Sequence, residues 1–299
     1  MEGPRTRWAA AGDVELAFET FGSPSDPPVL LIMGFAMQML GWPDELCTRL
    51  ATRGHHVIRY DHRDVGLSTH LDDRPPGDAV AVMAGDRSSV AYTVADLARD
   101  AVGLLDALEI DTAHLVGASF GGAIAQTAAI EHPERVRSLT SVMASTGDHR
   151  VGAPTPAALA ALLAPPPRSR HEAIEHAMRV GRALGSPGFP FDESAARRRA
   201  AAAFDRRRDP AGISRQFVAL LTAPDRTECL RQLAVPALVI HGDRDPLVAP
   251  DGGRAIAAAI PAAKLVVIAG MGHDLPREVW PRLVDEIAAL VARAEAGAA

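Results

Sequence analysis

Ser119 is the side chain of this sequence whose surroundings point most directly to chemistry. It stands at the centre of residues 117–121, Gly-Ala-Ser-Phe-Gly, directly after the apolar stretch 112–116. A G-x-S-x-G sequence between a buried strand and a helix is typical of a nucleophile elbow, a strained turn that exposes the serine hydroxyl at a helix N-terminus. Gly117 and Gly121 supply the small neighbours that such a turn needs. The motif predicts a nucleophile for acyl transfer.

A serine hydroxyl also needs a base that takes its proton, and histidine suits this task near neutral pH. His273 follows the apolar stretch 264–269, and Asp245 follows the apolar stretch 236–240. Functional groups of an open parallel sheet gather just beyond the carboxyl ends of its strands. We therefore expect Ser119, Asp245 and His273 to meet as nucleophile, acid and base, with the aspartate orienting the imidazole.

Two other aspartates compete with Asp245 for the role of the acid. Asp243 lies in the same turn but closer to the end of the strand, so we expect it to support the loop. Asp148 follows the strand-like stretch 139–144, where some serine hydrolases carry their acid. Asp245 is preferred to both. His241 ends the strand before this turn, and we expect it to order the acid loop rather than to act as the base.

Acyl transfer further requires hydrogen-bond donors for the negative oxygen that develops in the transition state. One predicted donor is the backbone N–H of Phe120, the residue after the nucleophile. The other is expected from the loop that follows the apolar stretch 28–33. There, Gly34 allows a tight turn that would aim the backbone N–H of Phe35 at the site.

Methionine and phenylalanine side chains near these loops are candidates for a substrate pocket. Such a pocket would accept a hydrophobic acyl or alcohol group because its lining is apolar. Methionine side chains would also adapt to an irregular substrate shape. For the candidates in the later helical part of the chain, packing within their own small core is an equally good explanation. The predicted pocket residues are Gly34, Met37, Met39, Met178, Phe204 and Phe217.

The rest of the chain supplies the elements that must position these groups. The sequence predicts further strands at 14–18, 29–33 and 57–60, and helices at 44–52, 94–108 and 123–131. Strands that alternate with helices predict an α/β fold with a doubly wound, mostly parallel sheet. Residues 78–89 mix Gly, Asp and apolar residues, which favours a loop.

Between residues 146 and 233 the strand pattern gives way to helical periods separated by Pro and Gly. Helices are predicted at 156–163, 171–184, 193–205 and 214–221. We expect residues 1–145 and 234–299 to form the core, and residues 146–233 to form a helical cap inserted over the active site.

Two arginine triplets, at 197–199 and 206–208, lie in the predicted helical insertion. Consecutive residues of a helix point about 100° apart, so neither triplet defines one face. Glu193, Asp205 and Asp209 lie nearby and balance the charge. We therefore expect both triplets on a solvated surface rather than in a site for an anionic substrate.

Taken together, these motifs resemble the serine α/β-hydrolases over nearly the whole chain. Residues 60–68, Tyr-Asp-His-Arg-Asp-Val-Gly-Leu-Ser, are similar to the segment after the fourth strand of that family. Met33 stands where the common pattern has a histidine, and with residues 40–45 it resembles the branch of the aclacinomycin methylesterases and related actinobacterial esterases. The resemblance implies hydrolysis of a carboxylic ester.

Composition and charge indicate which partners and which cellular location we expect. The net charge of −6 and the pI near 6.0 give no electrostatic signature of nucleic-acid binding. No apolar stretch approaches a membrane span, and the first eight residues lack the apolar core of a signal peptide, so we expect a cytoplasmic protein. Cys47 and Cys229 are expected to be isolated thiols. No metal or organic cofactor is predicted, and the adjacent pair His55 and His56 would point apart on a strand.

Other functions share the same catalytic groups. Hydrolysis of a lactone, a thioester or a carbon–carbon bond, and perhydrolysis, each need an activated serine and an oxyanion hole. The fold also serves small-molecule binding proteins and receptors with little turnover. A small hydrophobic ester, with a polyketide methyl ester as one candidate, is the predicted substrate.

Overall fold

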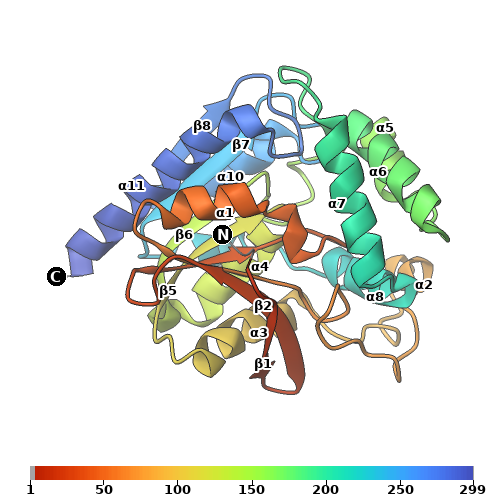
Figure 1. Ribbon diagram of the computed structural model, residues 1–299, viewed down its shortest axis with the longest axis horizontal. Coiled ribbons are helices and arrows are strands. Elements are labelled where there is room, and N and C mark those ends of the chain that lie inside the picture. Colours follow the sequence, from red (N-terminus) through yellow and green to blue (C-terminus); the bar gives the residue numbers. More distant parts are fainter. Residues whose placement is uncertain (1–3, 299) are drawn as a thin grey trace.

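The computed structural model describes residues 4–298, which form an eight-stranded sheet with helices on both faces (Figure 1). The strand order is β1-β2-β4-β3-β5-β6-β7-β8, and from β4 to β8 all neighbours are parallel. Strands β1 and β2 add an antiparallel edge. The strands are β1 Arg7–Ala11, β2 Val14–Phe21, β3 Pro28–Ile32, β4 His56–Tyr60, β5 Ala113–Ala118, β6 Val136–Val142, β7 Ala237–Gly242 and β8 Lys264–Ile268.

Each face of the sheet carries its own apolar core, because successive side chains of a strand point to opposite faces. In β3, Leu30 and Ile32 pack with α3 (Val94–Ala107), α4 (Phe120–Glu131) and α10 (Pro250–Ala259). Val29 and Leu31 of the same strand pack with α1 (Asp44–Ala51) and α11 (Trp280–Ala298). The central strands are buried on both sides, which explains their continuous apolar sequences.

The predicted α/β fold is confirmed, and the predicted strands and helices recur with ends shifted by a few residues. Other elements differ from the predictions. The alanine-rich edge strand β1 and the helices α9 (Thr227–Leu230), α10 and α11 were not predicted. Residues 78–89, predicted as a loop, contain the helix α2 (Ala79–Met83), which begins where the Asp78 side chain accepts a hydrogen bond from the backbone N–H of Ala81 at 2.9 Å.

A helical segment, residues 146–233, joins β6 to β7. It contains α5 (Pro156–Leu162), α6 (Arg170–Leu184), α7 (Glu193–Arg206), α8 (Pro210–Leu221) and α9 (Thr227–Leu230). The first four helices begin at residues whose side-chain oxygens accept a backbone N–H of the first turn, which explains where they start. These capping residues are Thr155, Ser169, Asp192 and Asp209. In Figure 1, α5, α6 and α7 stand beside the sheet rather than on the faces that α3 and α11 cover.

The expectation of solvated arginine triplets holds for Arg197 and is wrong for Arg206. Arg197 is half-exposed and pairs with Glu175 and Glu193 at 2.8 and 2.9 Å, respectively. The guanidinium of Arg206 instead donates to the carboxylate of Asp61, which is fully buried after β4. A buried carboxylate needs a compensating charge, and the arginine supplies it from the helical segment. This ion pair links the segment to the core.

Two further expectations concern the chain as a whole. Cys47 is buried and Cys229 is exposed, and both are free thiols, as predicted. Within residues 4–298, no helix combines the length and the apolar character that crossing a membrane requires.

His114 of β5 makes stability depend on pH. Its Nδ1 lies 2.8 Å from Ser138 Oγ and its Nε2 lies 3.1 Å from Glu295 Oε1. Burial lowers the pKa of His114 from 6.5 to about 4, although Glu295 opposes this. The unfolded chain therefore binds a proton at a higher pH than the folded chain, and stability is lost as the pH falls from 6.5 towards 4. Between pH 7.5 and pH 5, the free energy of unfolding of the parent protein should therefore fall by about 2 kcal/mol more than that of His114→Asn.

Urea unfolding of both proteins at pH 7.5, 6 and 5 measures this difference. Equal losses of the free energy of unfolding in the two proteins would contradict a neutral buried His114.

Candidate active site

Ser119 occupies the turn between β5 and α4 in a strained conformation, with φ 55° and ψ −120°. Backbone angles in this region cost free energy in a residue with a side chain. Residues strained in this way are found mainly at functional sites. The backbone N–H of Ser119 donates to Val142 O of the neighbouring strand β6 at 2.9 Å, and its carbonyl accepts from Gly122 N at 2.8 Å. Main-chain bonds on both sides therefore hold the strained turn.

Two glycines allow this turn because backbone atoms lie where a side chain would otherwise stand. A Cβ at Gly117 would collide with the carbonyl of Gly121. A Cβ at Gly121 would collide with the carbonyl of Ile32 at the end of β3. The requirement for small residues follows from these close approaches, as the motif predicted.

The three predicted catalytic side chains come together beyond the carboxyl ends of β5, β7 and β8. Ser119 Oγ lies 2.9 Å from His273 Nε2, and His273 Nδ1 lies 2.8 Å from Asp245 Oδ2. These distances allow hydrogen bonds along the whole chain of groups. With the aspartate accepting from Nδ1–H, the imidazole presents a free Nε2 to the serine hydroxyl.

Asp245 is kept ionised by the groups around it. Its Oδ1 accepts from the backbone N–H groups of Leu247 and Val248, both at 2.9 Å, and His241 Nε2 lies 3.4 Å from Oδ2. Burial would raise the pKa of this carboxyl, but hydrogen bonds from His241, His273 and Val248 outweigh burial and hold the pKa well below its usual range. Asp245 is therefore negatively charged near neutral pH.

The loop after β3 lies beside Ser119. A Cβ on Gly34 would come within 3.6 Å of Ser119 Oγ. Within residues 4–298, the backbone N–H groups of Phe35 and Phe120 have no acceptor. Free N–H donors are what the oxyanion of acyl transfer needs, and the assignment of Phe35 and Phe120 to this role stays a prediction.

The chain also matches known proteins. A sequence model of the α/β hydrolase fold matches residues 27–276. The chain is similar to rhodomycin D methylesterase DauP of Streptomyces sp. (strain C5), with 33% identity that covers 95% of this chain and 97% of that protein. It is equally similar to rhodomycin D methylesterase DnrP of Streptomyces peucetius, with 33% identity and the same coverage. The chain belongs to the α/β hydrolase fold family.

Solved structures agree with this assignment. Esterase RhEst1 from Rhodococcus sp. ECU1013 superposes with a TM-score of 0.75 at 22% identity, over 96% of this chain and 98% of that one. A hydrolase from Pseudomonas aeruginosa PA01 superposes with a TM-score of 0.69 at 26% identity, over 97% of both chains. The resemblance to methylesterases of this fold is confirmed, and this α/β hydrolase is an ester hydrolase of the carboxylesterase type.

Each of the two rival aspartates of this α/β hydrolase makes another contact. The carboxylate of Asp148 binds Arg150 at 2.8 Å, and this hydrogen bond lowers the pKa of Asp148 to about 2. Asp243 accepts from the backbone N–H of Gly270 at 2.7 Å. This bond ties the loop after β7, which carries Asp245 (the acid loop), to the loop after β8, which carries His273 (the histidine loop). His241 donates to Val248 O at 2.8 Å across the same turn. Both neighbours thus support the loop that carries Asp245.

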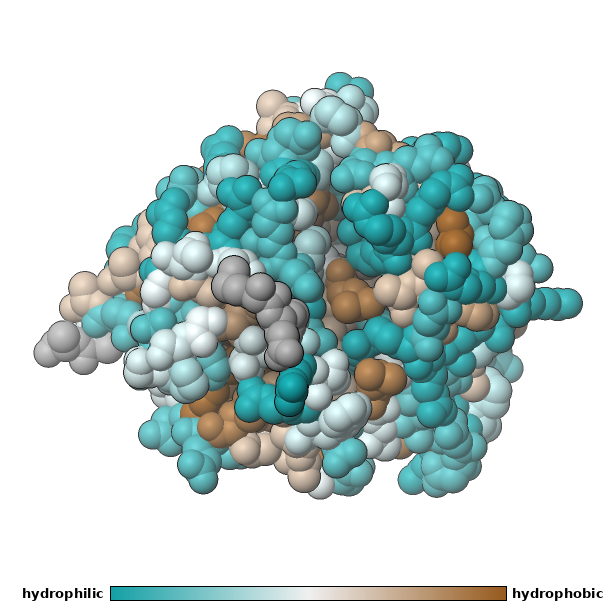
Figure 2. Space-filling model, viewed as in Figure 1, coloured by the Kyte–Doolittle hydropathy of each residue, from teal (hydrophilic) through white to brown (hydrophobic). Residues whose placement is uncertain are grey.

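The predicted pocket residues separate into distinct environments. The ring of Phe35 packs against that of Phe217 from α8, with centroids 5.6 Å apart. Met37 is 40% exposed, whereas Met39 and Met178 are fully buried and Phe204 is half-buried on α7. Their part in a pocket stays a prediction. Figure 2 shows hydrophobic surface in a recess of the molecule, between the core and the helical segment.

Sequence reasoning missed the residues that hold the histidine loop. The backbone N–H of His273 donates to Leu184 O at 2.7 Å, and that of Gly272 donates to Ser186 Oγ at 2.8 Å. Ser186 also donates to the carboxylate of Asp274. Residues 184–186 span the end of α6 and carry no motif, so nothing in the sequence pairs them with a position almost ninety residues later.

One group of potential metal ligands lies outside the site. Asp64, His70 and Asp209 place their ligand atoms within 4.8 Å of one another. Each is already engaged, because Arg215 binds both carboxylate oxygens of Asp64 and His70 Nδ1 lies 2.6 Å from Asp209 Oδ2. The arginine supplies the positive charge that an ion would bring.

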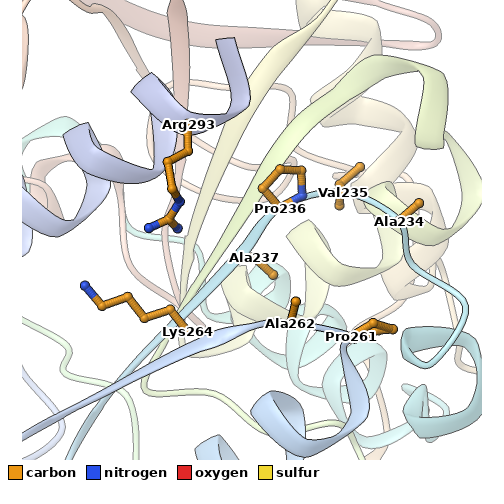
Figure 3. A pocket seen from close by; sticks show the side chains of 8 residues that line it. All are labelled: Ala234, Val235, Pro236, Ala237, Pro261, Ala262, Lys264 and Arg293. Atoms are coloured by element: carbon orange, nitrogen blue, oxygen red, sulfur yellow. The ribbon is translucent and has the colours of Figure 1, made fainter. Parts of the chain in front are cut away.

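A surface pocket of about 330 Å³ opens where β7 and β8 begin (Figure 3). Ser119, in contrast, follows the end of β5, which runs parallel to these strands. Residues at the start of β7 and β8 line it together with Arg293 of α11. Its lining residues are Ala234, Val235, Pro236, Ala237, Pro261, Ala262, Lys264 and Arg293. None of them is a predicted site residue.

The elbow contact can be tested by adding one carbon. In Gly121→Ala the new Cβ meets the main-chain carbonyls of Ile32 and Met33, which cannot move aside as a side chain can. We expect a loss of at least about 2 kcal/mol in the free energy of unfolding. Gly297→Ala is the control, because nothing lies within 4 Å of its Cβ, and should change stability by less than about 0.5 kcal/mol. Similar losses in the two variants, measured by urea unfolding, would contradict the close approach.

Proposed function

We propose that this α/β hydrolase cleaves a carboxylic methyl ester on a hydrophobic substrate of the polyketide class, through an acyl-enzyme on Ser119. The hydrogen-bonded chain from Ser119 through His273 to Asp245 carries the proposal. The two rhodomycin D methylesterases support the choice of a methyl ester, since the similarity extends over 95% of this chain. The cytoplasmic location stays a prediction.

The proposed reaction has two halves. In the first, Ser119 Oγ attacks the ester carbonyl carbon while His273 Nε2 takes the hydroxyl proton. The N–H groups of Phe35 and Phe120 bind the oxyanion that forms. The tetrahedral intermediate then collapses, the bond to the alkoxy oxygen breaks, and His273 returns the proton so that methanol leaves.

In the second half, water attacks the acyl carbon and gives its proton to His273 Nε2. The bond to Ser119 Oγ breaks, the serine recovers its proton and the carboxylic acid is released. Asp245 stays ionised throughout and stabilises the imidazolium each time it forms.

We further propose that the helical segment, residues 146–233, acts as a cap that shapes the substrate side of the site. Two contacts support this role. Phe217 packs on Phe35 in the predicted oxyanion loop, and Leu184 accepts the backbone N–H of His273. The predicted core is residues 1–145 and 234–299, of which 4–145 and 234–298 then form the core; residues 1–3 and 299 lie outside the described residues.

Replacement of the serine tests the reaction. Ser119→Ala should lose at least about 10⁴-fold in kcat on p-nitrophenyl butyrate and on rhodomycin D, because no nucleophile remains. Hydrolysis is followed by absorbance for the first substrate and by methanol release for the second. Retained turnover in Ser119→Ala would refute the mechanism. Cleavage of a lactone or a carbon–carbon bond in place of the esters would redirect the substrate assignment, and tight binding without turnover would indicate a receptor.

The acid is tested by matched aspartate substitutions. Asp245→Asn should lose about 10⁴-fold in kcat, because the amide no longer selects the productive imidazole tautomer. Asp148→Asn and Asp243→Asn are the controls and should stay within about tenfold of the parent, since neither touches His273. A larger loss in Asp148→Asn than in Asp245→Asn would show that the acid is misassigned.

The pH profile separates the base from the acid. Only a neutral imidazole accepts the serine proton, so kcat/KM should fall in acid with a slope of one proton. Asp245 does not contribute to this fall, because its pKa lies well below the usual range of an aspartate. The rate of p-nitrophenyl butyrate hydrolysis between pH 4.5 and 9 gives the profile. A flat profile, or a fall steeper than one proton, would count against this division of roles.

A further inference from the structure

Gln216 of α8 reaches from the helical segment to the loop that carries the proposed oxyanion donor. Its Oε1 accepts a hydrogen bond from the backbone N–H of Ala36 at 2.6 Å. Gln216 is fully buried, with 0% of its surface exposed. Ala36 has a positive φ of 56°, a conformation that a residue with a side chain seldom adopts without support. The glutamine supplies that support across 180 positions of sequence.

Other contacts from the same segment converge on this loop, residues 33–38. Gln38 Nε2 donates to Ala203 O at 2.8 Å and to Arg207 O at 3.2 Å, both at the end of α7. From the core, the ring nitrogen Nε2 of His62 lies 2.8 Å from Met33 O. The loop is thus held at its start by the core and along the rest of its length by the helical segment.

The second polar atom of Gln216 shows that packing alone does not explain the residue. Its Nε2 is buried and has no hydrogen-bond partner in the described part of the chain. A buried donor without an acceptor costs stability, and an apolar residue of the same shape would remove that cost. The bond to Ala36 is therefore the contact that a methionine of similar length cannot replace.

The peptide unit that Gln216 fixes is the one that follows the proposed donor. Ala36 N belongs to the peptide plane between Phe35 and Ala36, and the donor N–H of Phe35 belongs to the plane before it. Once the second plane is fixed, the backbone angles of Phe35 determine where its N–H points. We infer that Gln216 is a positioning residue that aims the Phe35 N–H at the oxyanion, so that the helical segment takes part in the chemistry. This inference rests on the proposed oxyanion hole.

A positioning role for an oxyanion donor predicts a particular kinetic change. The donor binds the developing charge more strongly than the ground-state carbonyl, so its misplacement lowers kcat and leaves KM nearly unchanged. Loss of one oxyanion donor typically costs about 10²–10³ in rate, and a misaimed donor retains part of that effect. We expect Gln216→Met to lower kcat by about 10–100-fold, with KM changed by less than about threefold.

Gln126→Met is the matched control. Gln126 of α4 is also 0% exposed, and its amide binds Ser141 Oγ at 3.2 Å and Arg226 Nε at 3.1 Å. Within residues 4–298, no hydrogen bond joins its side chain to the loop at 33–38. The control should lower the melting temperature and leave kcat within about twofold of the parent. Gln216→Asn replaces Gln216→Met if the latter fails to fold, because the shorter amide stays polar and cannot reach Ala36 N.

The experiment measures kcat, KM and melting temperature on p-nitrophenyl butyrate, and the inhibition constant of butylboronic acid. A boronic acid bonded to Ser119 places an oxygen in the oxyanion hole, so its inhibition constant should rise by the same factor as kcat/KM falls. An unchanged kcat in folded Gln216→Met, a change confined to KM, or an equal fall in Gln126→Met would overturn the positioning role. Activity that survives in Ser119→Ala would instead refute the proposed function itself.

Discussion

The site depends on how closely two segments of backbone approach each other beneath Ser119. Gly121 lies against the carbonyl groups at the end of β3, and Gly117 lies against the carbonyl of Gly121. No residue with a side chain fits either position, so the sequence here is determined by main-chain sterics. The same approach brings the end of β3, and with it Gly34, next to Ser119. One packing constraint therefore places both Ser119 and the loop that begins at Gly34.

The other proposed catalytic side chains are fixed in a comparable way, by main-chain bonds rather than by packing alone. Asp245 accepts two backbone N–H groups of its own turn, and His273 is held through its backbone by Leu184. The acid loop and the histidine loop are joined where Asp243 accepts the N–H of Gly270. Each side chain thus lies on a short loop whose shape is set independently, and the three meet because parallel strands end at one edge of the sheet.

The sequence predicts what local patterns encode. The buried strands appear as apolar runs because both faces of the sheet are covered, and the elbow appears because its glycines must stand beside the serine. Asp245 and His273 could be assigned because each follows such a run. Gln216 and Arg206 carry no comparable signal, since their partners Ala36 and Asp61 lie 180 and 145 positions away and are set by the tertiary fold. The edge strand Arg7–Ala11 was missed because its alanine-rich sequence has no clear alternation.

The position of the helical segment, between two neighbouring strands of the sheet, bears on how enzymes of this fold could acquire new substrates. The segment leaves β6 and returns through β7, and these strands are direct neighbours, with Val142 opposite Ile240. A recombination event that exchanged the whole segment would leave the register of every strand intact. The exchanged segment would nevertheless need an acceptor for the N–H of Ala36 and a cation for Asp61. Exchange of the segment by this route is therefore restricted at the positions that contact the core, Gln216 and Arg206 among them.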